Sequence, residues 1–382
     1  MAKLSSSNGL EKRPKLRFPG FYEPWKVFKA EELFQNITDK NHPDETVLTI
    51  IQGKGTLPRE QAGRNIHYDD ASLSNYKRVE QGDFIIHLRS FEGGLEMANE
   101  AGIVSPAYTI LRCKRPHASL FYDAYFHTDE FINHNLSKSV EGIRDGRQIS
   151  YEAFKWLGIP YCEPTEQEKI SSLFSVLNER ITKQRDLIES LKKYKRGAVA
   201  HILSGKSVAF AVTSSWTEHT LSELCTEFRS GRNISATLIH QNGNYPVYGG
   251  NGIRGYCNQY SHDGEYVVVG RQGALCGNVR LIQGKNYLSE HAIAVQANEA
   301  NETKFLLYLL DYMKLGQYSD QGAQPGLAVN KLLRLKCMVP DKQTQIKIAS
   351  FLMSFDFQIS TQERMLMLLN CQRRALLQQL FI

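Results

Sequence analysis

A glycine-rich segment is the first part of the chain whose residue types could support chemistry. Residues 250–255 read Gly-Asn-Gly-Ile-Arg-Gly and match the G-x-G-x-x-G pattern of dinucleotide-binding loops, and residues 245–248 before them could form a strand. That pattern binds a pyrophosphate only where a helix begins inside the glycines. Residues 256–264 are instead rich in turn formers and poor in helix formers. The segment therefore indicates a glycine turn, and a nucleotide-dependent enzyme is the weakest function that we consider.

The remaining patterns of catalytic residues are incomplete. Gly205-Lys206-Ser207 resembles the end of a phosphate-binding loop, but Ala200 stands five residues before the glycine and the preceding element is a predicted helix. The sequence has no Asn-Pro-Pro-aromatic methyltransferase motif, no H-E-x-x-H zinc motif and no G-x-S-x-G nucleophile elbow. Seven cysteines without a C-x-x-C pair favour neither a disulfide framework nor a structural zinc site. We therefore expect no catalytic residues, no metal ligands and no cofactor bound by this chain.

The composition is that of an ordinary soluble protein. The 382 residues suffice for two domains, and 42% hydrophobic with 23% charged residues exclude a disordered or collagen-like chain. No stretch approaches the roughly 20 apolar residues of a membrane helix, and the first residues lack an apolar signal core. We therefore expect a cytoplasmic protein without a membrane partner. The net charge of +6 permits a polyanionic partner without requiring one.

The chain repeats itself, which organises all of its other features. Segments that begin at Glu166 and Thr344 align with an offset of 178 residues. Their identical pairs are Gln167/Gln345, Lys169/Lys347, Ile170/Ile348, Ser172/Ser350, Ile181/Ile359, Gln184/Gln362, Leu191/Leu369 and Arg196/Arg374.

The similarity continues outside these segments. Ile159-Pro160 matches Val339-Pro340, residues 82–89 resemble residues 264–271, and Trp25 matches Trp216. The order is therefore a globular portion and a helix, twice. The predicted boundaries are 1–163, 164–205, 206–340 and 341–382.

Each repeated helix carries an apolar stripe with alternating steps of four and three residues, which is coiled-coil spacing. Gln184 and Gln362 interrupt the two stripes at the same place, and a buried polar side chain fixes register. We predict that the two helices pair and that the two glutamines face each other; the alternative is that each helix only packs on its own domain. The candidate spacer residues are Ile170, Leu177, Ile181, Gln184, Ile188, Leu191, Ile348, Phe355, Ile359, Gln362, Leu366 and Leu369.

The globular portions mix short β-branched runs with Gly, Asn and Asp turns, without the regular strand-helix alternation of a doubly wound sheet. We predict the α+β class, with two pseudo-symmetric globular domains joined by two long matched helices in an antiparallel coiled coil. Strands are expected over 47–51, 84–88, 108–111, 266–269 and 292–295, and helices over 121–131 and 304–312.

Glycine turns with polar and planar side chains suit a close approach to nucleic acid. Arginine and glutamine can contact guanine and adenine with two hydrogen bonds, and lysine neutralises phosphate. Arg89 and Arg271 stand at equivalent ends of equivalent predicted strands. The candidate DNA-binding residues are Lys54, Arg89, Asn251, Arg254, Tyr256, Arg271 and Gln272.

The chain resembles the DNA specificity subunit (S subunit) of type I restriction-modification enzymes. The resemblance rests on residues 14–21 with Trp25, on residues 245–252 and 264–271, and on the duplicated proline-containing lead-in to each long helix. It implies two target recognition domains that read a bipartite site in double-stranded DNA, with the helices setting the spacing between its halves. It also implies a non-catalytic subunit on which two methyltransferase (modification) subunits and the restriction subunits assemble. S-adenosylmethionine, ATP and Mg are then expected on those partners.

The alternative from another functional class is a non-catalytic scaffold. In that interpretation the helices recruit partners, the two repeated domains bind protein, and nucleic acid has no effect on binding.

Overall fold

The computed structural model describes residues 11–62, 70–142, 147–204, 215–320 and 325–381. The chain divides into two compact units. The first unit combines Met1–Arg185 with Met365–Ile382, and the second is Asp186–Arg364. Each unit contains both helices and sheets, so the predicted α+β class is confirmed.

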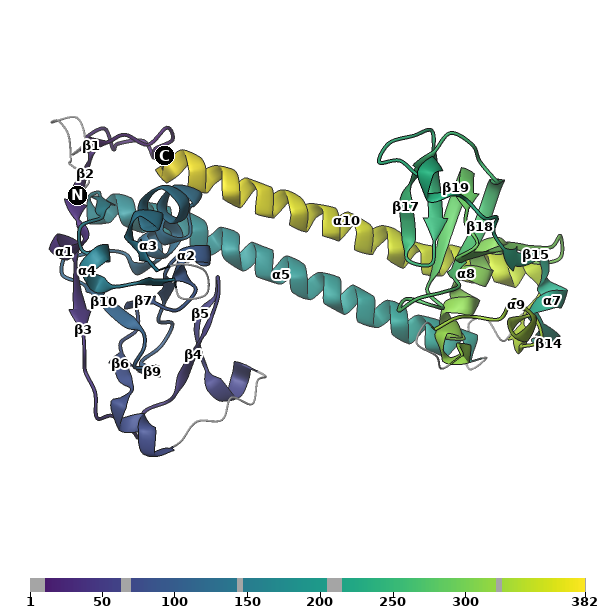
Figure 1. Ribbon diagram of the computed structural model, residues 1–382, viewed down its shortest axis with the longest axis horizontal. Helices are drawn as coiled ribbons and strands as arrows, with labels where there is room; N and C mark the ends of the chain where they lie inside the picture. The colour runs from purple at the N-terminus through teal and green to yellow at the C-terminus, as the bar shows by residue number, and fades with distance from the viewer. Residues whose placement is uncertain (1–10, 63–69, 143–146, 205–214, 321–324, 382) are drawn as a thin grey trace. The chain divides into compact units, whose positions relative to one another are not determined.

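The first unit has two main sheets (Figure 1). One has the order β1-β2-β13 and the other β3-β10-β7-β8, while β4-β5, β6-β9 and β11-β12 form two-stranded pairs. The strands are β1 (Glu11–Lys12), β2 (Trp25–Lys29), β3 (Phe34–Ile37), β4 (Leu48–Ile51), β5 (Gly55–Pro58), β6 (Lys77–Val79), β7 (Phe84–Ile86), β8 (Glu96–Met97), β9 (Gly102–Val104), β10 (Thr109–Cys113), β11 (Val140–Glu141), β12 (Gln148–Ile149) and β13 (Gly158–Tyr161). Its short helices are α1 (Ala30–Leu33), η2 (Arg59–Ala62), η3 (Asp70–Asn75), α2 (Ser90–Gly93), α3 (Ser119–Phe126), η4 (Glu130–Asn135), η5 (Leu136–Ser139) and α4 (Tyr151–Phe154).

The second unit is built on a six-stranded sheet with the order β15-β20-β18-β19-β16-β17, and a separate pair, β14-β21. Its strands are β14 (Thr217–Thr220), β15 (Cys225–Ser230), β16 (Tyr245–Gly249), β17 (Gly252–Cys257), β18 (His262–Gly270), β19 (Val279–Leu288), β20 (Ala292–Ala297) and β21 (Lys336–Val339). Its short helices are α7 (Leu221–Leu224), η7 (Ala236–Leu238), α8 (Thr303–Tyr312), η8 (Leu315–Tyr318) and α9 (Val329–Leu332). The amphipathic helix α8 buries Phe305, Tyr308 and Leu309 against the sheet residues Val267 and Val295.

Two 40-residue helices, α5 (Pro164–Leu203) and α10 (Lys342–Phe381), each contribute to both units. Their observed bounds differ from the predicted 164–205 and 341–382 by at most two residues at each end, and the predicted boundary at 205/206 lies outside the described residues. In the first unit, Phe381 at the end of α10 is fully buried beside Trp25 and Phe121.

The two long helices run antiparallel in each unit. In the first unit Arg373 Nε donates to Asn178 Oδ1 over 2.8 Å, and in the second Lys195 Nζ lies 2.6 Å from Asp356 Oδ1. Arg373 is Lys195 advanced by 178 residues, and Asp356 is Asn178 advanced by the same number. The basic residues that interrupt the apolar stripes therefore make equivalent contacts, which the duplication explains.

The repeat also holds at the entrance to each domain. Strand β13 pairs with β2 in the first unit, and β21 pairs with β14 in the second. The short helix that follows is capped in the same way, because Glu32 accepts from the backbone N–H of Lys29 and Glu223 accepts from that of Thr220. Glu32 and Glu223, which follow Trp25 and Trp216 by seven residues each, are therefore equivalent caps.

A buried glutamine joins each long helix to its domain. Gln167 is fully buried; its Nε2 donates to the carbonyl of Cys162 (2.8 Å), and its Oε1 accepts from the backbone N–H of Ala118, the N-cap of α3 (3.1 Å). Gln345 makes the same contacts with the carbonyl of Pro340 (2.9 Å) and with the N–H of Glu302, the N-cap of α8 (2.9 Å).

One predicted helix is wrong in its extent. The helix expected over 121–131 ends at Phe126, and the chain resumes as the π-helical turn η4. The Thr128 hydroxyl donates to the carbonyl of Tyr125 and accepts from the N–H of Phe131, so it competes with the backbone for helical hydrogen bonds. Because the apolar residues on both sides of the break are buried, apolar spacing alone did not reveal it.

The glutamine contacts yield a stability prediction. Gln345→Ala leaves the Glu302 N–H and the Pro340 carbonyl without this partner in a buried site, so unfolding of the second unit should become easier by about 2 to 4 kcal/mol. Urea denaturation, monitored by hydrogen exchange of the amides in the second unit, measures this change in the free energy of unfolding. The control is Gln358→Ala on the exposed face of the same helix, which should change stability by less than about 0.5 kcal/mol. Equal effects of the two variants would contradict the role of Gln345.

Candidate nucleic-acid interface

The glycine segment of the second unit forms the tight turn between β16 and β17, and β17 follows it where a dinucleotide fold needs a helix. Gly252 has a φ of +96°, which favours glycine. A Cβ on Gly250 would lie 2.4 Å from the carbonyl oxygen of Gln272, so only glycine allows this close packing. The sequence prediction of a glycine turn is confirmed.

Arg254 lies in a β-bulge of this hairpin. The register shifts between Val247, which pairs with Gly255, and Tyr248, which pairs with Ile253, so Arg254 has no direct opposite. A bulge redirects a side chain away from the regular pleat. Arg254 and the turn residue Asn251 are both exposed. This hairpin therefore exposes a guanidinium in its bulge and an amide in its turn.

Arg280 on β19 belongs to the same surface, although sequence reasoning did not select it. Its guanidinium would lie 3.1 Å from a Cβ on Gly252, and it lines a small pocket of about 160 Å³ together with Asn251 and Asn278. Nothing in the sequence distinguishes Arg280 from other basic residues on strands, because its position depends on the pairing of β19 with β18.

Arg271 and Gln272 lie behind the turn and support it. Arg271 is half-buried and its Nη1 donates to the carbonyl of Glu290 over 3.3 Å. The amide oxygen of Gln272 is hydrogen-bonded to His291 Nδ1. Tyr256 is farther along β17, opposite Pro246, where its backbone forms two hydrogen bonds with His240. Of the five candidates in this half, Asn251 and Arg254 are thus the most accessible.

In the first unit Lys54 is exposed at the turn of the β4–β5 hairpin. The two glycines beside it, Gly53 and Gly55, have φ values of +73° and +77°. Their backbone N–H groups donate to the two oxygens of the fully buried Glu96, over 2.6 and 2.9 Å. The Lys54 side chain therefore extends from a turn whose backbone is held by hydrogen bonds to the Glu96 carboxylate.

Arg89 is exposed at the N-cap of α2. Helix α2 packs on the same hairpin, since the Gln52 side chain lies so close to Gly93 that any Cβ there would overlap it. The structure thus brings the elements that carry Lys54 and Arg89 into contact.

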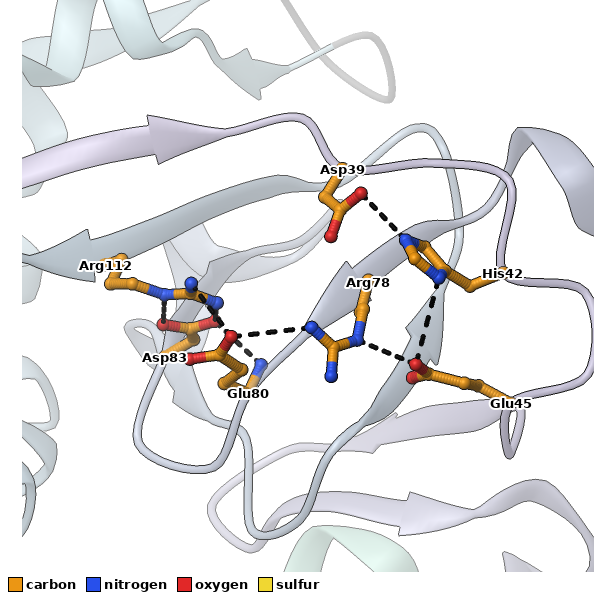
Figure 2. Close-up of polar contacts among 7 residues, drawn as sticks. All are labelled: Asp39, His42, Glu45, Arg78, Glu80, Asp83 and Arg112. Carbon is orange, nitrogen blue, oxygen red and sulfur yellow. Dashed lines mark hydrogen bonds and ion pairs between the residues drawn. The ribbon is translucent and has the colours of Figure 1, made fainter.

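A network of charged side chains joins the segment before β4 to β6 and β10 (Figure 2). Arg78 on β6 lies 2.7 Å from Glu45 and 3.5 Å from Glu80. Glu80 also pairs with Arg112 of β10, which forms two hydrogen bonds with the buried Asp83. The segment between β3 and β4 is tied into this network through Asp39, His42 and Glu45.

All of the predicted spacer residues are buried or half-buried. Leu177, Ile181 and Leu369 form a cluster in the first unit, and Leu366 packs against it. The contact between Gln184 and Gln362 would join one unit to the other and stays a prediction. Ile170 lies in the first core and Ile348 in the second, Ile188 and Ile359 are buried, and Leu191, Phe355, Gln184 and Gln362 are half-buried.

The described residues contain no cluster of three or more His, Cys, Asp or Glu side chains that could hold a metal ion. All seven cysteines are unpaired. Within the described ranges, no helix has the length and apolar character needed to cross a membrane. The Gly205-Lys206-Ser207 segment lies outside the described residues.

Comparisons with known proteins point to one family. Residues 213–367 match the model of the type I restriction modification DNA specificity domain. The EcoprrI specificity subunit of Escherichia coli is 46% identical over 141 residues, and a putative type I specificity subunit of Mycoplasma pneumoniae is 32% identical over 144 residues. Each match covers 36% of this chain, and 35% and 39% of the two relatives, so this chain matches only about a third of the length of each.

The fold extends the likeness to nearly the whole chain. The crystal structure of the type I restriction-modification S subunit from M. genitalium aligns over 97% of this chain and 99% of its own, with a TM-score of 0.65 and 18% identity. A chain from a structural study of complex assembly and conformational transition of the type I system aligns over 96% and 98%, with a TM-score of 0.53 and 15% identity. Residues 213–367 therefore carry a type I restriction modification DNA specificity domain, and the chain has the fold of the type I S subunit from M. genitalium.

Proposed function

We propose that this protein is a DNA-binding specificity subunit that reads a bipartite target and directs the methyltransferase and restriction subunits of a type I complex to it. The observation that carries the proposal is the duplication. Two recognition domains are attached to matched long helices through the same buried contact of Gln167 and Gln345. The second of them contains a DNA specificity domain. Two related domains, each attached in the same way to one of two matched helices, suit a DNA target that consists of two half-sites.

The hairpins of the two domains supply the contacts for DNA. A two-stranded β-ribbon fits the major groove, where arginine and asparagine form paired hydrogen bonds with guanine and adenine. In the second domain Arg254, Asn251 and Arg280 surround the β16–β17 turn. In the first, Lys54 and Arg89 stand on the β4–β5 turn and on the helix packed against it.

The helices act as the spacer between the half-sites. A helix of 40 residues is about 60 Å long, which compares with roughly two turns of duplex DNA at about 34 Å each. Polar contacts such as Lys195 with Asp356 fix which residues of α5 and α10 are opposite each other.

The partners follow from the family. Two methyltransferase subunits with S-adenosylmethionine, and restriction subunits with ATP and Mg, would dock on this non-catalytic chain in the cytoplasm. Exposed apolar side chains on α10, namely Phe357 (73% exposed) and Met367 (59%), favour a protein partner on that helix. The same observation favours the second candidate function, a protein-binding scaffold, and DNA binding separates the two.

Arg254 provides a test of base reading. Arg254→Ala should weaken discrimination at one half-site by about 1 to 3 kcal/mol, since one bidentate base contact contributes about that much, and should leave the other half-site unchanged. The measurement is selection of split duplexes from a random library by the subunit with its methyltransferase partner.

The control is Arg334→Ala, which removes the same charge from another exposed position of the second unit. It should leave the selected bases unchanged. A loss of selectivity that is equal for both variants would point to net charge instead of base contacts, and wild-type binding without any sequence preference would refute the proposed function.

The spacer proposal predicts an effect of helix length. Insertion of seven residues near the middle of both α5 and α10 lengthens the pair by about 10 Å. Because base pairs are stacked about 3.4 Å apart, the recognised spacer should grow by about three base pairs. Sequencing of the methylated sites in cells that express the variant with its partners measures the spacer.

The matched control is the same insertion in α5 alone, which should misalign the helices and lower stability without defining a new spacer. An unchanged spacer after the double insertion would contradict the spacer proposal.

A further inference from the structure

A buried carboxylate, that of Glu96, lies beneath the glycine turn of the β4–β5 hairpin. Glu96, on β8, is 0% exposed, and each of its oxygens accepts a backbone N–H from the turn, that of Gly53 or that of Gly55. A carboxylate is costly to bury unless its charge is compensated. The two N–H groups supply part of that compensation, and they tie the carboxylate to the part of the backbone that carries Lys54.

His127 supplies the opposite charge. Its Nε2 lies 3.3 Å from Glu96 Oε1, and its Nδ1 lies 2.7 Å from the carbonyl oxygen of Asp123. A carbonyl and a carboxylate only accept hydrogen bonds, so both ring nitrogens must carry a proton to satisfy these contacts. The geometry therefore favours the imidazolium form, in a side chain that is only 14% exposed.

The turn tolerates little change on the side that faces β8. A Cβ on Gly55 would lie 2.5 Å from the carbonyl oxygen of Met97. The amide of Asn99 donates to the carbonyls of Lys54 and Thr56, each over 2.8 Å. Since all these contacts are made to backbone atoms, they fix the path of the turn whatever side chains it presents.

We propose that Glu96 and His127 form a clamp that sets the conformation of the β4–β5 turn, and that they are positioning residues for the bases read by the first domain. The inference rests on the proposed function for its DNA consequence. The clamp itself is a property of the fold. In this arrangement the exposed side chains of the turn contact the target, and the buried ion pair fixes the position of the backbone that carries them.

The clamp is sensitive to pH in one direction. Burial by itself lowers the pKa of His127, but the hydrogen bond to Glu96 and the charges of Asp123 and Glu96 outweigh it and raise the pKa from 6.5 to about 8. A folded pKa above the unfolded one means that the stabilisation is complete below about pH 6.5 and is lost as the pH rises through about 8. The titratable and charged groups around His127 are Glu96, Asp123, His87, Glu92, Asp129, Arg373 and Arg374.

Hydrogen exchange of the intact chain tests the clamp directly. The Glu96→Gln variant replaces one acceptor oxygen with a donor and removes the negative charge. The amides of Gly53 and Gly55 should therefore exchange at least about 10-fold faster. Exchange rates in the other strands of the first unit should stay unchanged. Between pH 6.5 and 9, after correction for intrinsic exchange, the wild-type turn should lose protection by up to about 30-fold, the factor that separates the two pKa values. His127→Gln should abolish this pH step.

The control is His42→Gln, which alters a histidine–carboxylate contact in the charged network of the segment before β4. It should leave the turn protected. A second pair of variants does not touch the clamp: Gly55→Ala should displace the turn because of the Met97 oxygen, whereas Gly53→Ala, which meets nothing within 4 Å, should retain the turn with only backbone strain.

A second experiment tests DNA recognition. It uses the complex of this chain with its methyltransferase partner and the random library of split duplexes. Glu96→Gln and Gly55→Ala should relax base selection at one half-site about 10-fold and leave the other half-site as in the wild type. Unchanged selection by both variants, or an unchanged exchange rate at the turn in Glu96→Gln, would overturn the inference while the proposed function stands. A wild-type complex that selects no split site would instead refute the proposed function, and the exchange experiment would still decide on the clamp.

Discussion

The structure depends on a single type of contact, the buried side-chain amide that joins a long helix to a globular domain. An amide can donate and accept at once, so Gln167 and Gln345 each connect two backbone groups that no regular element satisfies. One of these groups is the carbonyl of the residue that follows the strand before the helix, and the other is the N–H at the N-cap of a domain helix. A shorter or an apolar side chain would leave both groups unpaired in the core, so the orientation of each domain on its helix is specified chemically.

The duplicated contacts show how one type of attachment can support two different domains. The caps, the entry strands and the glutamines are equivalent in the two halves, and so are the polar contacts between the helices. The hairpins that we propose to contact DNA differ: Gly53 and Gly55 rest on a carboxylate, whereas Gly250 rests on backbone carbonyls. Because the contacts that attach each domain to its helix do not involve the hairpin turns, the sequences of these turns can diverge without disturbing the attachment.

Much of this arrangement could be predicted from the sequence, because it depends on local patterns that recur. Apolar spacing predicted both long helices to within two residues at each end, and the turn formers after Gly255 excluded a nucleotide loop. The same repeated segments carried the resemblance to type I specificity subunits, and residues 213–367 match the DNA specificity domain of that family.

What the sequence did not reveal depends on contacts between distant residues. Gln167 and Gln345 were visible as an identical pair, but their partners lie about 50 and 43 residues away in the chain. Arg280 joins the turn surface only through strand register, and Thr128 ends a helix through its hydroxyl. Glu96 and His127 carry no motif, since a buried ion pair becomes apparent only when the turn above it is in place.

The position of Phe381 in the first core has a consequence for how the protein is made. The first unit combines residues up to Arg185 with residues from Met365 onward, so Phe381 reaches Trp25 and Phe121 only after the whole second unit has been synthesised. At about 5 to 20 residues per second, nearly 200 residues of further synthesis take on the order of ten seconds or more. During that interval the first core lacks the Phe381 side chain, whereas all residues of the second unit, Asp186–Arg364, are already present.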